Sequence, residues 1–225
     1  MDEQQRKQLD ELGYLIFKSL LSHAQIETIL SRLEELWSLE GDHAGEENYI
    51  EPGVRRLANL ANKGEMFRSL YAHPQVLEVV EMVMGPDIRA SMVNARDVPP
   101  HTGVRMPFHM DSDKGRIRDE LGYSAATAIW MLDEFTTANG ATAFMPGSHL
   151  LGKSPKEVLA DLNASHPAEI VIEASRATCW SSTGTAGMPV ARTEPRVTAG
   201  RSLSIICGLT CLGRRTAANI WMESR

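Results

Sequence analysis

His109 and Asp111 are the two residues whose types and spacing most clearly suggest chemistry, and they lie two positions apart in the segment Pro107–Asp111. On a β-strand, side chains two residues apart point to the same face, so an imidazole and a carboxylate would stand side by side. Such a pair supplies one nitrogen and one oxygen of a 2-His-1-carboxylate triad, which binds Fe(II) and leaves positions open for a co-substrate and oxygen. The spacing therefore predicts two metal ligands. The alternative for so short a motif is an exposed histidine and aspartate at the end of a strand.

A second signal is the segment 139–149, which reads Asn-Gly-Ala-Thr-Ala-Phe-Met-Pro-Gly-Ser-His. Asn-Gly and Pro-Gly are turn dipeptides, and the mostly apolar residues between them suit a short strand. The segment alone predicts a hairpin. His149 at its end is a further candidate ligand, although hydrogen bonds from Ser148 and His149 to the loop backbone are the simpler interpretation.

The hydrophobic pattern indicates the scaffold that positions these motifs. The N-terminal part predicts a strand over 14–17 and helices over 2–11, 24–39 and 64–84. From residue 87, short apolar segments separated by Pro/Gly turns predict a helix over 155–163 and strands over 88–93, 105–109, 125–132, 141–145 and 169–172. This order predicts an α+β fold with a mainly β core, as an antiparallel barrel or sandwich with helices packed outside. We expect a single domain over residues 1–225.

Composition and charge limit the classes of function. The chain has 225 residues, 43% of them hydrophobic and 23% charged, with a formal net charge of −6. An acidic chain without clusters of lysine and arginine is a poor binder of nucleic acid. No stretch approaches the roughly 18 consecutive apolar residues of a membrane span, and the start, Met1–Gln5, is unlike the basic start of a signal peptide. We expect a cytoplasmic protein that binds neither nucleic acid nor membranes.

Together, these motifs resemble a known family. The segments that carry the resemblance to the phytanoyl-CoA dioxygenase family are Leu12–Ile16, Arg56–Leu60, His109-x-Asp111, Ala128–Asp133 and Asn139–His149. The resemblance extends from about residue 8 to residue 173. It implies a double-stranded β-helix of the jelly-roll or cupin-like kind, a non-haem Fe(II) centre, and the use of 2-oxoglutarate and O₂ to hydroxylate a small organic substrate.

The resemblance also implies roles for individual residues. His109 and Asp111 correspond to metal ligands of the family. Asn94, Trp130 and Thr142 correspond to neighbours of the 2-oxoglutarate pocket. For Trp130, the alternative is an aromatic core residue on a strand.

Residues 175–225 depart from the family pattern. The pattern implies a second histidine on a late strand, in a segment like W-H-x-G-x-x-N, and then an arginine that binds the distal carboxylate of 2-oxoglutarate. This chain has no histidine after His166. Residues 1–174 hold 27 acidic and 16 basic side chains, whereas residues 175–225 hold two acidic side chains, seven arginines and all three cysteines. We therefore expect the last strands of the barrel to be missing or altered.

One hypothesis explains this departure by a shift of the reading frame near residue 175. The tail can be back-translated into codons and read again from the third base of each codon. The given residues then fix the second and third bases of most new codons, and these bases permit the string GDLLVFNGHCWHAGRANRTPRHRRSL. That string contains the missing histidine, an asparagine and several arginines. With the tail as written, the sheet edges would be open, so we expect the chain to fold poorly and to bind Fe(II) weakly or not at all.

Three functions stay open from the sequence. The first is an Fe(II)- and 2-oxoglutarate-dependent dioxygenase, which the missing histidine would leave inactive as written. The second is a non-catalytic pseudoenzyme that binds a ligand on the same scaffold. The third is a metal-dependent isomerase or lyase, with a two-ligand site completed by His149 or His101. Arg105, on the predicted strand with His109, is a candidate contact for an anionic substrate or one partner of a surface ion pair.

Overall fold

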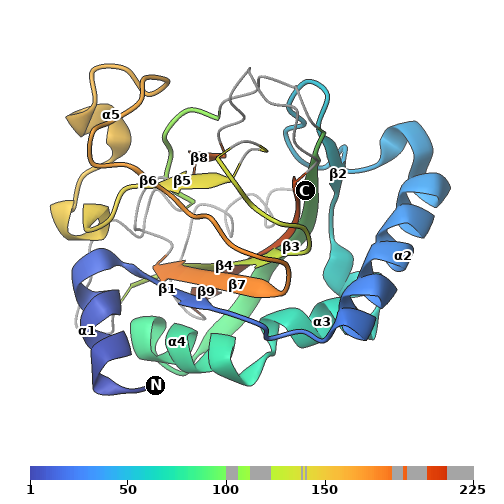
Figure 1. The fold of residues 1–225 in the computed structure, drawn as a ribbon, viewed down its shortest axis with the longest axis horizontal. Helices are drawn as coiled ribbons and strands as arrows, with labels where there is room; N and C mark the ends of the chain where they lie inside the picture. Colours follow the sequence, from blue (N-terminus) through green and yellow to red (C-terminus); the bar gives the residue numbers. More distant parts are fainter. Residues whose placement is uncertain are drawn as a thin grey trace, which may run out of the picture.

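The computed structural model describes residues 1–99, 106–111, 123–137, 139, 141–183, 190–191 and 202–211. Within these residues the chain forms two antiparallel sheets with helices outside them (Figure 1). The mainly β core with external helices that the sequence predicts is therefore confirmed.

The first two helices begin and end where local sequence signals place them. Helix α1 covers Glu3–Leu12, begins with a capping box between Asp2 and Gln5, and ends at Gly13, whose φ of +83° suits glycine. Helix α2 covers His23–Glu40 and begins with a capping box at Ser22. The predicted helices over 2–11 and 24–39 are thus confirmed to within a residue.

The helical region predicted over 64–84 is two helices. Helix α3 covers Glu65–Tyr71 and helix α4 covers Pro74–Met84, with His73 as the residue before α4. Proline has no backbone N–H and disfavours helical dihedrals in the residue before it, so it ends one helix and begins the next. The apolar periodicity continues through this break, which is why the pattern predicts one helix.

The larger sheet has six strands in the order β1-β7-β4-β9-β3-β2. Their bounds are β1 Tyr14–Phe17, β7 Thr178–Thr183, β4 Ala125–Met131, β9 Ser202–Cys211, β3 Ile88–Val98 and β2 Arg55–Leu57. A smaller sheet has the order β6-β5-β8, with β6 Ile170–Val171, β5 Thr142–Phe144 and β8 Val190–Ala191. Short 3₁₀ helices cover Gly41–His43, Leu60–Asn62 and Ser148–Leu151, and α5 covers Pro155–Val158.

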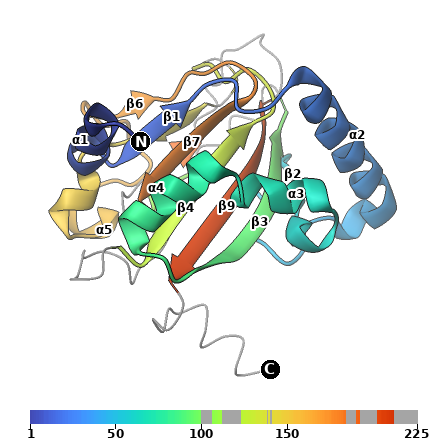
Figure 2. The same cartoon turned by 90° about the horizontal axis from the view of Figure 1, so that it is seen from below.

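The two faces of the larger sheet have different neighbours. Helices α3 and α4 lie across one face (Figure 2), and the small sheet lies over the other face (Figure 1). The main apolar cluster includes Val79 and Val80 of α4 together with Ala128 and Trp130 of β4. On the other face, Phe144 of the small sheet packs edge-on against Trp180 of β7, with ring centroids 5.2 Å apart. Functional side chains on the second face therefore lie between the two sheets.

The C-terminal tail supplies strands to the interior of the larger sheet. Strand β7 lies between β1 and β4, and β9 lies between β4 and β3. In β9, Leu203, Ile205, Cys207 and Leu209 belong to the apolar cluster on the helix side, which is the two-residue period of a half-buried strand. The last strands are therefore altered in sequence rather than missing: β7 and β9 pair on both sides, whereas β8 pairs with β5 at the edge of the smaller sheet.

Two further predicted elements differ in the structure. A strand is predicted over 105–109, but residues 106–109 have no regular structure, and residue 105 lies outside the described residues. The helix expected over 155–163 is only the single turn α5. Among the described residues, no helix is both long and apolar enough to cross a bilayer.

Candidate active site

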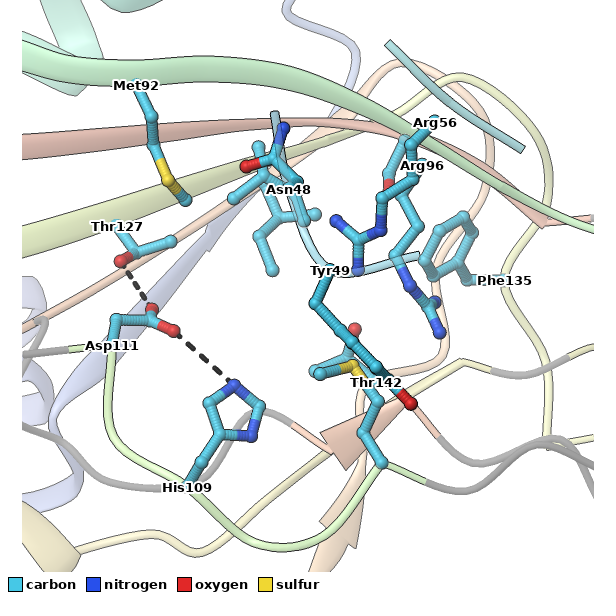
Figure 3. Close-up of a pocket in the computed structure, with 14 residues that line it drawn as sticks. Asn48, Tyr49, Arg56, Met92, Arg96, His109, Asp111, Thr127, Phe135 and Thr142 are labelled. Carbon is cyan, nitrogen blue, oxygen red and sulfur yellow. Dashed lines mark hydrogen bonds and ion pairs between the residues drawn. The ribbon is translucent and has the colours of Figure 1, made fainter. Parts of the chain in front are cut away.

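A cavity of about 250 Å³ lies between the two sheets. The larger sheet contributes side chains that alternate along each strand, so that one face of each strand lines the cavity. These residues are Met92 and Arg96 of β3, Thr127 and Ile129 of β4, and Ser204 and Ile206 of β9. Arg56 of β2, Thr142 of β5 and residues of the segments 48–49 and 106–111 complete the lining. Figure 3 shows how the labelled side chains point into this space.

His109 and Asp111 meet at one side of the cavity (Figure 3). Nε2 of His109 lies 3.6 Å from Oδ1 of Asp111, although the two residues lie on an irregular segment rather than a strand. Nδ1–H of His109 donates to the carbonyl oxygen of Pro107 at 2.9 Å in the tautomer that leaves Nε2 free. That hydrogen bond fixes the ring with Nε2 on the side of Asp111, and metal-ligating histidines are oriented by the same kind of bond.

Neighbouring residues fix the position of this pair. The Thr127 hydroxyl donates a 2.6 Å hydrogen bond to Oδ2 of Asp111. Phe108 is 1% exposed and packs with Ala143 of β5 and with Met145, and its backbone N–H donates to the carbonyl of Leu162 at 2.9 Å. The buried phenyl ring anchors the irregular segment, so tertiary packing and not strand geometry brings the imidazole and carboxylate together.

The electrostatics of His109 reflect its carboxylate neighbour. Burial by itself lowers the pKa of His109, but the nearby Asp111 carboxylate and the hydrogen bond to the Pro107 carbonyl together outweigh burial, so the pKa is raised above its usual value. The positive charge of Arg96 acts weakly in the opposite direction. The Asp111 carboxylate therefore stabilises positive charge on the imidazole ring.

The opposite side of the cavity carries two guanidinium groups, Arg56 and Arg96, which pair with one buried carboxylate. Glu51 is 2% exposed and accepts from Arg56 through Nε at 2.8 Å and Nη2 at 2.7 Å, and from Arg96 through Nε at 3.0 Å. Burial would raise the pKa of Glu51, but the hydrogen bonds from Arg56 and the charge of Arg96 lower it to about 2. This carboxylate is therefore ionised at neutral pH.

The residues at this site fit part of a metal centre. Two ligands of one first-row ion, each bonded at about 2.0–2.2 Å, are separated by roughly 3.0–3.6 Å for bond angles of about 90–120°. The 3.6 Å between His109 and Asp111 agrees with that range. Over the described ranges, however, no group of three or more His, Cys, Asp and Glu side chains is placed to hold a metal ion.

Of the two histidines considered as a third ligand, the structure describes only His149, which lies away from His109 and Asp111. His149 is 4% exposed, and its Nε2 lies 2.9 Å from the carbonyl oxygen of Asp10. It lines a different cavity, beside Tyr123 and Leu9. His149 therefore bonds to backbone, as in the simpler interpretation, but to the backbone of helix α1 and not to that of its own loop. His101 lies outside the described residues, as does Arg105.

The three residues expected near a co-substrate pocket have different surroundings. Thr142 lines the cavity. Asn94 lies on β3 between Met92 and Arg96, where its Oδ1 accepts from the backbone N–H of Asn59 at 3.2 Å and its Nδ2 donates to Asn48 at 3.3 Å. Asn94 therefore holds the segment that carries Asn48 against the cavity.

Trp130 does not lie in the cavity. It is 0% exposed in the apolar cluster on the helix side, with its ring 5.4 Å from that of His73. Because strand side chains alternate, Thr127 and Ile129 face the cavity while Trp130 faces α4. A role beside a co-substrate does not fit this position, and the alternative of a core aromatic does.

Sequence reasoning did not single out Thr127, Glu51 or Arg96. Thr127 is one polar residue in an apolar strand, and Glu51 follows a segment with no predicted structure. Arg96 had a weak signal, because the strand predicted over 88–93 continues to Val98 and places a charged residue at a buried position. A buried arginine needs a partner, and that partner comes from a distant loop.

Comparison with known proteins gives a family and a fold. The family model described as "Phytanoyl-CoA dioxygenase (PhyH)" matches residues 9–190. Among curated proteins, the chain is 27% identical over 161 residues to the peroxisomal phytanoyl-CoA dioxygenase of Bos taurus, covering 65% of this chain and 47% of that protein. It is 27% identical over 152 residues to dioxygenase af480 of Aspergillus fumigatus, covering 65% of this chain and 48% of that protein. The chain thus spans about half the length of these relatives.

Solved structures show the same fold at low sequence identity. HygX from Streptomyces hygroscopicus, solved with nickel and 2-oxoglutarate bound, superposes with a TM-score of 0.75 at 16% identity, over 95% of this chain and 88% of that one. EctD from S. alaskensis, solved with bound iron, superposes with a TM-score of 0.76 at 16% identity, over 96% of this chain and 79% of that one. The predicted cupin-like, double-stranded β-helix architecture is confirmed.

Proposed function

The chain belongs to the phytanoyl-CoA dioxygenase family, and from that premise we propose that its cavity is the site of a non-haem Fe(II)- and 2-oxoglutarate-dependent dioxygenase. The reaction would hydroxylate a small organic substrate, with 2-oxoglutarate and O₂ converted to succinate and CO₂ and one oxygen atom placed on the substrate. The observation that carries the proposal is the convergence of His109 and Asp111 on one side of the cavity, 3.6 Å apart.

The described residues have distinct roles in this proposal. His109 Nε2 and an Asp111 carboxylate oxygen are the metal ligands, and the iron when bound supplies the site at which oxygen is activated. The carbonyl of Pro107 holds the His109 ring, and the Thr127 hydroxyl holds the Asp111 carboxylate. Thr142 contacts 2-oxoglutarate from the small sheet, and Asn94 acts indirectly by holding Asn48 at the cavity wall.

The missing histidine is part of the proposal. The sequence has no histidine after His166, and the described residues hold no third ligand near His109 and Asp111. We propose that the chain as written binds Fe(II) weakly, and that its tail from about residue 175 is read out of frame. The neighbouring frame would restore a W-H-x-G element and arginines in the same region of the barrel.

A comparison of two proteins tests this function. The first is the chain as written, and the second carries the tail of the neighbouring reading frame, which sequencing of the gene through codons 165–225 and beyond provides. We expect the restored protein to bind one Fe(II) and to release succinate in a 2-oxoglutarate-dependent way, and we expect both properties to be lost in its His109→Ala variant. We expect the chain as written to do neither.

Each outcome has a separate meaning. Tight iron binding and succinate release by the chain as written would contradict the part of the proposal that concerns the third ligand. A restored protein that folds but neither binds iron nor consumes 2-oxoglutarate would contradict the oxygenase function itself. Iron-independent ligand binding by both proteins would instead favour the pseudoenzyme.

A further inference from the structure

Tyr49 is an exposed aromatic residue at the cavity, and the proposed iron chemistry gives it no role. It is 74% exposed, yet it belongs to the residues that line the cavity between the two sheets. Figure 3 shows its side chain extending across the cavity from the segment 48–49. Most of its surface is therefore available to a molecule that enters there.

The backbone is held on both sides of Tyr49. Before it, Asn48 accepts a hydrogen bond at 3.3 Å from Nδ2 of Asn94, which is 5% exposed on β3. After it, Glu51 is 2% exposed and is bonded to the two arginines of the cavity wall. Because Tyr49 lies between these two attachment points, a ligand that packs on its ring loses little affinity to ordering of the chain.

The start of the same segment is packed against β2. Gly45 has a φ of +78°, and a Cβ at this position would lie 2.7 Å from the Cβ of Arg56, so only glycine fits. The backbone N–H of Asn48 donates to the carbonyl oxygen of Gly45 at 3.0 Å, and Nδ2 of Asn59 donates to Glu47 at 3.3 Å. The segment from Gly45 to Glu51 thus presents Tyr49 at the cavity before any ligand binds.

Several apolar side chains share the cavity with Tyr49. They are Met92, Met106, Ile129, Phe135 and Ile206. Met92 is 39% exposed; the register of β3 shifts between Ala90 and Met92, as at a β-bulge, which redirects side chains. A Cβ on Gly208 of β9 would lie 2.9 Å from Cγ of Met92, so the glycine leaves room for the thioether. The cavity therefore offers an aromatic ring and a thioether as accessible apolar surface.

The charge of the cavity wall limits what Tyr49 binds. The face of a tyrosine ring attracts either an apolar ring or a cation. Arg56 and Arg96 line the same cavity and share one carboxylate, Glu51, so this wall has a net positive charge. That charge disfavours an organic cation beside Tyr49 and leaves an uncharged ring as the better partner.

From these observations we propose that Tyr49 is a specificity-determining residue that stacks on an uncharged, flat ring of the organic substrate. The substrate class is therefore a compound with an unsaturated ring, held in the cavity that also contains His109 and Asp111. The inference rests on the proposed function for the reaction that follows binding, whereas the stacking itself requires no metal.

Two simple probes test the stacking without turnover. Phenol and its saturated counterpart cyclohexanol would be titrated into the metal-free chain, with ¹³C-labelled methionine methyl groups observed by NMR. We expect phenol to shift the signals of Met92 and Met106, which line the cavity, and not that of Met84, which is 3% exposed on the helix side. We expect phenol to bind about three- to tenfold more tightly than cyclohexanol, because an aromatic pair gains roughly this factor beyond burial of area.

Variants separate the ring of Tyr49 from its bulk and its hydroxyl. Tyr49→Leu keeps an apolar side chain without a ring, so phenol should lose its advantage over cyclohexanol. Tyr49→Phe keeps the ring and should retain that advantage. Leu39→Ala removes an apolar side chain that is 71% exposed on α2 and does not line the cavity, and it should change neither affinity. Because Tyr49 is exposed, these variants should fold, and the unshifted signal of Met84 reports that they do.

The proposal has clear contrary outcomes. Equal affinity of the parent chain for phenol and cyclohexanol would overturn it, as would an advantage of phenol that persists in Tyr49→Leu. Phenol-induced shifts confined to methionines outside the cavity would overturn it as well.

A second arm separates this inference from the proposed function. In the restored protein with Mn(II) and 2-oxoglutarate, phenol should still shift the signal of Met92, because the organic substrate and the co-substrate bind together. Displacement of phenol by 2-oxoglutarate would overturn the assignment of Tyr49 to the organic substrate. A restored protein that binds neither Mn(II) nor 2-oxoglutarate, while phenol keeps its advantage, would contradict the proposed function and still support the ring subsite.

Discussion

Thr127 donates a 2.6 Å hydrogen bond to Oδ2 of Asp111, and this bond leaves Oδ1 as the oxygen that faces Nε2 of His109 at 3.6 Å. Thr127 lies on β4, near the middle of the larger sheet, whereas Asp111 lies on an irregular segment. Strand β4 thus orients the Asp111 carboxylate through Thr127, because the irregular backbone around Asp111 does not fix that side chain.

Loss of this hydroxyl should weaken metal binding. Thr127→Val keeps the shape of the side chain but removes the hydrogen bond, and partners of ligating carboxylates are worth about 10–100-fold in metal affinity. We expect that loss for Fe(II) or Mn(II) in the restored protein, measured by competition with a metal indicator. Thr127→Ser keeps a hydroxyl and should stay within a few fold of the parent. Equal affinity in both variants would contradict the role of Thr127.

Glu51 should make the stability of the chain depend on pH under acidic conditions. Its pKa falls from 4.5 in the unfolded chain to about 2 in the folded one, so its contribution is complete above pH 4.5 and is lost as the pH falls toward 2. The shift corresponds to about 3 kcal/mol. Glu51→Gln should lower the free energy of unfolding by about that amount at pH 7 and flatten its decline below pH 4.5.

Urea unfolding at several pH values measures this effect, and the matched control is Glu65→Gln. Glu65 pairs with Arg68 at the surface, where its side chain is 80% exposed, and such pairs are worth about 1 kcal/mol or less. A Glu51→Gln variant as stable as the parent chain at pH 7 would show that the buried cluster does not stabilise the fold.

Trp130 should affect stability and leave ligand binding unchanged. Trp130→Phe removes buried ring volume from the helix side of the sheet, which costs roughly 1–2 kcal/mol of unfolding free energy. The cost is limited because Trp130 Nε1 has no hydrogen-bond partner in the described part of the chain. Metal and 2-oxoglutarate affinities should not change. A selective loss of 2-oxoglutarate binding with unchanged stability would instead favour the co-substrate role.

The two buried cysteines report whether the tail folds into the sheet. Burial raises the pKa of Cys179 well above its usual value and that of Cys207 to about 12, so neither thiol is ionised at neutral pH. We expect both to resist iodoacetamide at pH 8 in the native chain and to react in guanidinium chloride, as peptide mapping by mass spectrometry would show. Rapid modification of the native chain would mean that β7 and β9 are not held in the sheet.

Much of the fold follows from local signals in the sequence. The capping boxes at Asp2 and Ser22, and the left-handed glycine at Gly13, determine where the first helices begin and end. The predicted end of a strand was less accurate where the strand continued beyond its apolar residues. The strand predicted over 88–93, for example, continues as β3 through Arg96 to Val98. The placement of β9 between β4 and β3 depends on partners distant in the chain, and no local pattern specifies it.

For the site, the sequence by itself indicated the candidate ligand types, because an imidazole and a carboxylate two residues apart in His109-x-Asp111 are a chemical signal that needs no fold. The structure decided how they meet, since the buried ring of Phe108 and the Thr127 hydroxyl replace the strand geometry that the spacing suggested. The tertiary structure also determined that Trp130 packs on the helix side of the sheet and that Glu51 pairs with Arg56 and Arg96. The physical reason is that burial and electrostatic pairing depend on which distant segments pack together, and that is a property of the whole chain.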